Sequence, residues 1–191
     1  MSVLYQTLED RDNVDYVEAN GPFPGDVRDR WLGKGYYYWD TFIDAAHYWG
    51  YVSYKIKGKG YIIAKSEVSI PADKLLNLLE PEQLAMFTNW RDCYAKTFPE
   101  TEVTVEKVLT HAEKIMGSAF PYIAIKAEFR ESFINKGYQD RIYPRVNSNG
   151  KAYLDLKSPV QICIKDKSII GSDNFKVIYP LKYAEEGAYT F

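Results

Sequence analysis

The chain has 191 residues, of which 46% are hydrophobic, and its formal net charge is -2. This length and apolar content predict one globular domain over residues 1–191 that needs no disulfide or metal to fill its core. The charge excludes a basic surface that would bind a polyanion over its whole extent.

The N-terminus lacks a signal-peptide pattern, and the sequence has no run of 18 apolar residues. We therefore expect no membrane association and a cytoplasmic location. Aromatic residues are frequent, with 17 Tyr, 9 Phe and 4 Trp. Since tyrosine has a flat apolar face and a polar tip, this excess favours stacking sites as well as core packing. Cys93 and Cys163 lie far apart without a CxxC motif, which argues against a zinc site and favours a reducing compartment.

The first half of the chain alternates strand-like and short helical segments. In chain order, the predicted elements are a strand at 3–7, a brief helix or turn ending at Asn20-Gly21, a loop at 22–32, a strand at 35–39, a helix at 41–50, a strand at 61–70 and a short helix at 72–79. Thr41 and Asp44 give the helix at 41–50 a start signal, and Gly50 gives it a stop signal.

The second half begins with the most helical region, residues 81–118, which Pro81 opens and which contains an apolar repeat near 3.6 residues. Further on, the pattern predicts strands at 121–129, 160–166 and 175–183, and a turn at 147–150. The order of β-rich, α-rich and β-rich segments favours an α+β fold with a mainly antiparallel sheet.

Common catalytic motifs are absent. The sequence has no GxGxxG after a strand, no GxxxxGK[ST], no HExxH and no GxSxG, and it has only two histidines, so hydrolase chemistry is disfavoured.

The stretch "GKGYYYWDTFIDAAHYWG" (residues 33–50) resembles a known signature. It is similar to the second signature of the ADP-ribosyltransferase superfamily, in the poly(ADP-ribose) polymerase and diphtheria-toxin-like branch. In that signature a GKGxYF-type strand leads through an Asp into a helix with a Ser/Ala-Ala-x-Tyr element. The resemblance places Tyr37 and Tyr48 on the two tyrosines that sandwich the nicotinamide ring of NAD, and Ala45 on the Ser that bonds its carboxamide.

Two further segments resemble the other signatures of that family. Leu4-Tyr5-Gln6-Thr7 lies where the family has Leu-x-His-Gly, with Gln6 in place of the His and Thr7 at or beside the Gly position. The segment at 159–170 is similar to the Glu-x-x-x-x-Asp strand, with Gln161 in place of the Glu and a match at Asp166. Gln6 and Gln161 either bind the ribose hydroxyls or are ordinary polar strand residues.

The resemblance implies a split antiparallel sheet around an NAD cleft, with peripheral helices and residues 81–118 as a helical insertion. The strands at 3–7, 35–39 and 160–165 would meet at this cleft. Arg28 and Arg30, just ahead of the stacking strand, would pair with the pyrophosphate of NAD or remain solvated loop charges.

The resemblance further implies an NAD-dependent mono-ADP-ribosyltransferase that modifies a macromolecule, either protein or nucleic acid. Tyr37 and Tyr48 would hold the nicotinamide while Gln6 and Gln161 orient the ribose. Such a protein would serve as a bacterial toxin or defence factor, with an antitoxin or regulator as a further partner. The alternatives are an inactive module of the same fold that binds NAD, ADP-ribose or a protein partner, and a structural interaction domain whose aromatic residues form only core.

Overall fold

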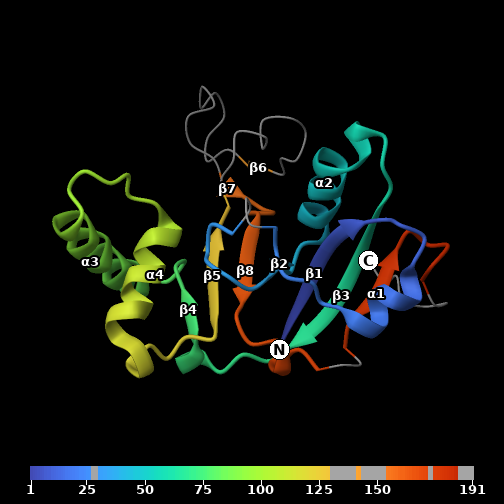
Figure 1. Ribbon diagram of the computed structural model, residues 1–191. Helices are drawn as coiled ribbons and strands as arrows, with labels where there is room; N and C mark the ends of the chain where they lie inside the picture. Colours follow the sequence, from blue (N-terminus) through green and yellow to red (C-terminus); the bar gives the residue numbers. More distant parts are fainter. Residues whose placement is uncertain (27–29, 130–140, 143–153, 172–173, 185–191) are drawn as a thin grey trace.

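A computed structural model of the protein describes residues 1–26, 30–129, 141–142, 154–171 and 174–184 (Figure 1). Within these residues the fold is α+β, as expected, and a seven-stranded sheet runs in the order β4-β5-β8-β2-β1-β3-β9. The strands of this sheet are β1 (Ser2–Glu9), β2 (Tyr36–Asp40), β3 (Tyr61–Val68), β4 (Leu75–Asn77), β5 (Ala124–Glu128), β8 (Val160–Ile164) and β9 (Lys176–Tyr179). Neighbouring strands are antiparallel except for β4 and β5, so the sheet is mixed.

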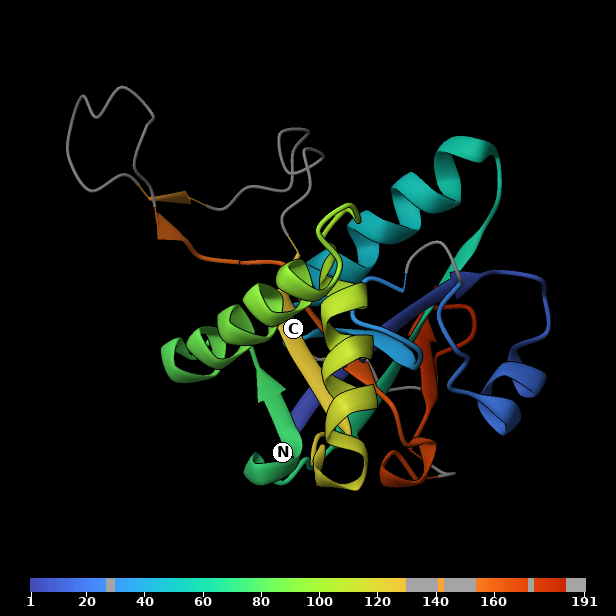
Figure 2. The same ribbon diagram turned by 60° about the vertical axis from the view of Figure 1, so that its left-hand side comes forward.

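Helices cover both faces of the sheet (Figures 1 and 2). The α-helices are α1 (Val14–Asn20), α2 (Ile43–Ser53), α3 (Pro81–Thr97) and α4 (Val105–Met116). Short 3-10 turns are η2 (Lys55–Lys57), η3 (Ala72–Lys74), η4 (Gly117–Ala119) and η6 (Lys167–Ile169), and β6 (Arg141–Ile142) pairs with β7 (Leu154–Asp155) as a separate ribbon.

Side-chain alternation along the strands separates the core into layers. On one face, Leu4, Tyr38 and Ile162 pack with Val17 of α1. On the other face, α3 and α4 cover the β4-β5-β8 half, where Leu109 of α4 packs with Ile125. Helix α2 covers the neighbouring part of this second face, where Ala46 packs with Trp39 and Ile63. The helical region at 81–118 is thus a layer on one end of the sheet.

The sheet is split beside β1. On one side, β1 pairs with β3 along its whole length, from Ser2 to Glu9. On the other side, only Leu4 and Tyr5 pair with β2, and the two strands then separate. This opening lies between the parts of β1 and β2 that the sequence assigned to the cleft.

Three local predictions are wrong. Residues 75–77 form β4 rather than a helix, because Leu76 is fully buried opposite Ile125 of β5. Helix α2 continues past Gly50 to Ser53, since that glycine allows close packing: a Cβ there would lie 2.3 Å from the ring of Tyr61. The α2 N-cap is Phe42, and the hydroxyl of Thr41 donates to Asp40 instead of capping the helix. The predicted turn at 147–150 lies outside the described residues.

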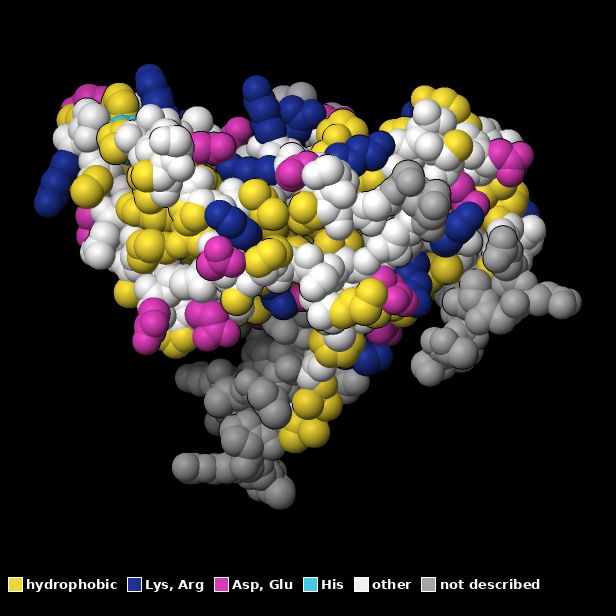
Figure 3. All heavy atoms as spheres, turned by 90° about the horizontal axis from the view of Figure 1, so that it is seen from below, with side chains coloured by type: hydrophobic (Ala, Val, Ile, Leu, Met, Phe, Trp, Pro, Cys, Tyr) yellow, Lys and Arg dark blue, Asp and Glu magenta, His cyan; other side chains and the backbone are white. Residues whose placement is uncertain are grey.

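The exposed surface carries no single-sign field on the face shown in Figure 3, where Lys and Arg side chains alternate with Asp and Glu between hydrophobic groups. No helix in the described ranges is both long and apolar enough to cross a membrane.

Candidate functional site

A cavity of about 320 Å³, called the narrow cavity below, opens where β1 and β2 separate. Gln6, Tyr37 and Gln161 all line it, so the three strands expected at the cleft do meet there. Gln6 lies on the same face of the sheet as Leu4, whereas Tyr37 lies on the opposite face, next to its strand partner Cys163. Because β1 and β2 are separated at this point, both side chains can line the same cavity. The lining residues are Gln6, Thr7, Leu8, Phe23, Pro24, Gly25, Asp26, Tyr37, Tyr38, Trp39, Trp49, Tyr54 and Gln161.

Gln6 is buried and its amide bonds three backbone groups across the split. Its Nε2 donates to the carbonyl oxygens of Phe23 (2.9 Å) and Tyr37 (3.1 Å), and its Oε1 accepts from the Phe23 N–H (2.9 Å). Because both amide hydrogens are used on protein carbonyls, Gln6 has none left for a ribose hydroxyl. In the structure, Gln6 thus joins the segment around Phe23 to the part of β2 that β1 leaves unpaired.

Tyr37 is fixed by both ends of its side chain. Its hydroxyl accepts from the Leu32 N–H and donates to the Gly33 carbonyl, each at 2.8 Å. Gly25 lies against the ring, where an added Cβ would come within 2.8 Å of Tyr37 Cδ2. Burial raises the pKa of Tyr37, so the hydroxyl stays neutral and acts here as an anchor.

Gln161 also lines the narrow cavity, and in the described structure its amide bonds fewer protein groups than that of Gln6. It is buried on β8 opposite Trp39, and its Oε1 accepts from the indole N–H of Trp31 at 2.7 Å. In the described part of the chain, no protein acceptor bonds its Nε2. Asp166, the other position matched by the third signature, accepts from the Ser168 N–H at the start of η6.

Helix α2 brings Trp49, rather than Tyr48, to the lining of the narrow cavity. Tyr48 is half-buried on α2 and, in the described structure, is not part of that lining. Ala45 is buried in the cluster beneath the helix, and the hydroxyl of Thr7 donates to the Ala46 carbonyl at 2.8 Å. Of the two tyrosines expected to flank a ligand ring, the described lining therefore contains Tyr37 but not Tyr48, and Trp49 lines the cavity from α2.

Arg30 does not line either cavity in the described structure, and its Nε donates to the Gly25 carbonyl at 2.8 Å. Arg28 lies outside the described residues. The guanidinium of Arg30 thus braces the chain that approaches β2, and sequence patterns gave no sign of this contact.

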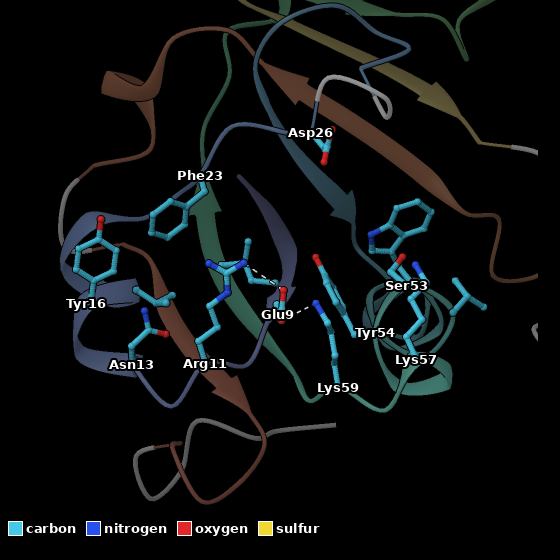
Figure 4. A pocket seen from close by; sticks show the side chains of 14 residues that line it. Glu9, Arg11, Asn13, Tyr16, Phe23, Asp26, Ser53, Tyr54, Lys57 and Lys59 are labelled. Carbon is cyan, nitrogen blue, oxygen red and sulfur yellow. Dashed lines mark hydrogen bonds and ion pairs between the residues drawn. The ribbon is translucent and has the colours of Figure 1, made fainter.

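A larger cavity of about 760 Å³, called the wide cavity below, adjoins the narrow one and shares its Leu8, Phe23, Asp26, Trp49 and Tyr54 walls (Figure 4). Tyr16 and Phe23 project from one side, and Tyr54 and Lys57 from the other. No motif in the sequence indicated that these residues share a cavity. The cationic and aromatic side chains at 51–59, which flank the predicted helix, are the signal that would have drawn attention to them.

Three cations line the wide cavity, namely Arg11, Lys57 and Lys59. Glu9 accepts from Lys59 (2.9 Å) and Arg11 (3.2 Å), and the hydrogen bond from Lys59, followed by that from Arg11, lowers the pKa of Glu9. Among the described residues, Lys57 forms no ion pair. The narrow cavity has no Lys or Arg in its described lining, and Asp26 is its one ionisable carboxylate there.

No group of three or more His, Cys, Asp or Glu side chains in the described ranges is arranged to hold a metal ion. Searches against protein-family models, curated proteins and solved structures give no match to the chain.

Proposed function

We propose that the protein binds NAD across the two adjoining cavities and transfers ADP-ribose to a macromolecular acceptor. The observation that carries this proposal is the distribution of charge along the cleft. The narrow cavity offers aromatic walls, the Gln161 amide and no described cation, whereas the wide cavity adds three cations. Arg11 and Lys59 pair there with Glu9, so Lys57 is the described cation of the wide cavity outside an ion pair, and Asp26 lines both cavities. NAD has the same division, since a cationic nicotinamide ring is joined to an anionic pyrophosphate.

The aromatic walls suit the nicotinamide ring. Tyr37 and Trp49 both line the narrow cavity, and an aromatic face attracts a cation held within about 6 Å of its centroid. Tyr37 is held by two hydrogen bonds and does not need to reorient when a ring enters. A preorganised wall avoids the entropy cost of ordering a side chain on binding.

The reaction would break the bond between the ribose C1′ and the nicotinamide nitrogen. The bonding electron pair goes to the nitrogen and leaves neutral nicotinamide, while an acceptor nucleophile forms the new bond to C1′ and gives up its proton. Gln161 supplies a neutral hydrogen bond where the family has a carboxylate, and preorganised electrostatic groups are worth about 10²–10³ in rate. Transfer is therefore expected to be slow and to depend on a base that the acceptor brings.

Matched variants of adjacent helix residues test the binding step. Trp49→Ala should weaken the affinity for nicotinamide and NAD about tenfold, the value of a lost aromatic contact. Tyr48→Ala should leave both affinities unchanged, because that side chain lies outside the described cavity lining. Calorimetry of the two folded variants measures these affinities. Equal losses from the two substitutions would contradict a role for Trp49 as a wall of the nicotinamide site.

A labelling experiment tests the transfer. The protein is incubated with NAD labelled in the adenosine part and with a cell lysate, and label is measured separately on protein and on nucleic acid. Label on either supports the proposal, and release of nicotinamide with no labelled acceptor indicates a glycohydrolase instead.

The second candidate is an inactive module that binds NAD or ADP-ribose. The favouring observation is that Gln6, at the position of the family His, spends its amide hydrogens on backbone carbonyls. Saturable NAD binding without nicotinamide release, also for Gln161→Glu, would identify this module.

A further inference from the structure

We infer that Trp31 is a positioning residue that turns Gln161 into a hydrogen-bond donor toward the narrow cavity. The inference deepens the proposed function and rests on it for the identity of the ligand. It begins with the 2.7 Å contact between Trp31 Nε1 and Gln161 Oε1, which joins two side chains 130 positions apart in the chain.

The chemistry of the indole fixes which end of the amide faces Trp31. An indole nitrogen only donates, and a side-chain amide accepts only through its oxygen. The oxygen of Gln161 must therefore point at Trp31, and the opposite assignment would set two donors against each other. The Nε2 group is then directed away from Trp31, and Gln161 lines the narrow cavity.

Packing holds Trp31 in the place that this contact requires. Its ring lies 5.6 Å from that of Phe129, and Phe129 in turn lies 5.8 Å from Trp39. The next residue, Leu32, is anchored through its N–H to the Tyr37 hydroxyl. Since Trp39 is the β2 partner of Gln161, the donor and the acceptor are attached to the same rigid group of rings and strands.

The consequence is a preference for ligands that present an oxygen acceptor at this point. A carboxylate at position 161 would accept a hydrogen bond from a ribose hydroxyl, whereas Gln161 held by Trp31 donates one. The ligand group that fits is a carbonyl or hydroxyl oxygen, such as those of the nicotinamide carboxamide and its ribose. Trp31 thus sets the polarity of recognition without contacting the ligand itself.

The bond is tested by proton–nitrogen NMR without any ligand. Trp31→Phe keeps the ring packing and removes the N–H, which identifies the Trp31 indole resonance by its loss. In Gln161→Met that resonance should move upfield to the position of an indole without this partner, while those of Trp39, Trp49 and Trp90 change less. An unmoved Trp31 resonance in folded Gln161→Met would overturn the inference, whatever the protein does with NAD.

The effect on recognition is tested by a double-mutant cycle with nicotinamide as the probe. Trp31→Phe should weaken binding about threefold to tenfold, the equivalent of one hydrogen bond. In the Gln161→Met background the same change should have no effect, because Trp31 acts through Gln161. Additive losses would overturn the positioning role. If nicotinamide does not bind at all, the proposed function and the recognition step fail together, while the Trp31 shift still decides the Trp31–Gln161 pairing.

Discussion

The two sides of β1 differ in how they are held. Toward β3, every residue from Ser2 to Glu9 has a strand partner. Toward β2, pairing stops after Leu4 and Tyr5, and side chains take over: Gln6 bonds Phe23 and the Tyr37 carbonyl, and Tyr37 bonds Leu32 and Gly33. A backbone ladder closes one side, whereas the other side remains open enough to be hollow.

This difference indicates that a site in a sheet can be built by replacing strand pairing with a few buried side-chain bonds. Such bonds are more sensitive to substitution than a ladder, since one side chain serves several backbone groups that water cannot reach. The open side of β1 should therefore respond strongly to single changes, and the β3 side weakly.

The largest effect is expected for Gln6→Leu. The substitution keeps the size of the side chain but leaves the Phe23 N–H, the Phe23 carbonyl and the Tyr37 carbonyl without this partner. The free energy of unfolding should fall by about 3 kcal/mol, because each buried polar group left unpaired costs about 1–3 kcal/mol and water restores part of the loss. Denaturant titration measures it.

The matched control is Ser66→Ala, which removes a buried polar group from β3 opposite Leu4. Its hydroxyl makes one long contact of 3.4 Å with Tyr38, and the β1–β3 ladder is untouched, so the loss should stay below about 1 kcal/mol. Equal losses from the two variants would mean that the open side of β1 is no more fragile than the paired side.

Tyr37→Phe is the next test. Removing the hydroxyl leaves the N–H of fully buried Leu32 without its partner and the Gly33 carbonyl with only the weak Cys163 thiol donor, at a cost of about 2 kcal/mol in unfolding free energy. The control Tyr38→Phe, on the opposite face of the same strand, loses only the contact with Ser66 among the described residues and should cost less. Thermal unfolding of both variants gives the ranking, and a costlier Tyr38→Phe would contradict it.

Alkaline pH should lower the free energy of unfolding through Cys163, the β8 residue that pairs with Tyr37. Burial raises the pKa of this thiol to about 12. The unfolded chain loses this proton near its usual pKa of about 8.5, whereas the folded chain retains it. The contribution of the thiol to stability is therefore fully present below that pH. It is lost as pH rises toward the folded pKa, by at most about 1.4 kcal/mol per pH unit.

Cys163→Ala should flatten this alkaline decline in unfolding free energy, even though the lost sulfur lowers stability at neutral pH. The exposed Cys93 provides the control, because Cys93→Ala should leave the pH slope unchanged. Urea titrations between pH 8 and pH 10.5 test the pair, and an unchanged slope in Cys163→Ala would show that this thiol is not responsible.

The smallest effect concerns charge at the wide cavity. If NAD binds as proposed, Lys57→Gln should reduce its affinity by about 0.5 kcal/mol and leave nicotinamide affinity unchanged. The effect should disappear at high salt, because an exposed cation acts on the pyrophosphate through a screened charge. Lys55→Gln lies on the same 3-10 turn but outside the described lining and should change neither affinity. Calorimetry at two salt concentrations separates them.

Much of the fold could be predicted from local patterns, while the site could be predicted only in part. The segments that form β3 and β8 are rich in β-branched residues, which favour strands. The apolar run at Leu75 and Leu76 suits a strand or a helix, and its strand partner Ile125 lies far along the chain. Tyr48 and Trp49 differ by one helix position, about 100° of rotation, which the sequence does not determine. The side-chain hydrogen bonds of Gln6 and Trp31 join segments far apart in the chain, so no local sequence pattern indicates them.

The order of strands also bears on how the protein emerges during synthesis. The central strand β2 is made early, but its partner β8 is made late, and the Trp31–Gln161 bond joins positions 130 residues apart. Contacts of such long range form slowly, because a large loop must close before they give any stability. A nascent chain released before β8 would contain β1, β2 and β3 but would lack Gln161 and the β8 side of the cleft. Truncated products should therefore be unable to bind the ligand, and the cleft should be among the last parts of the molecule to form.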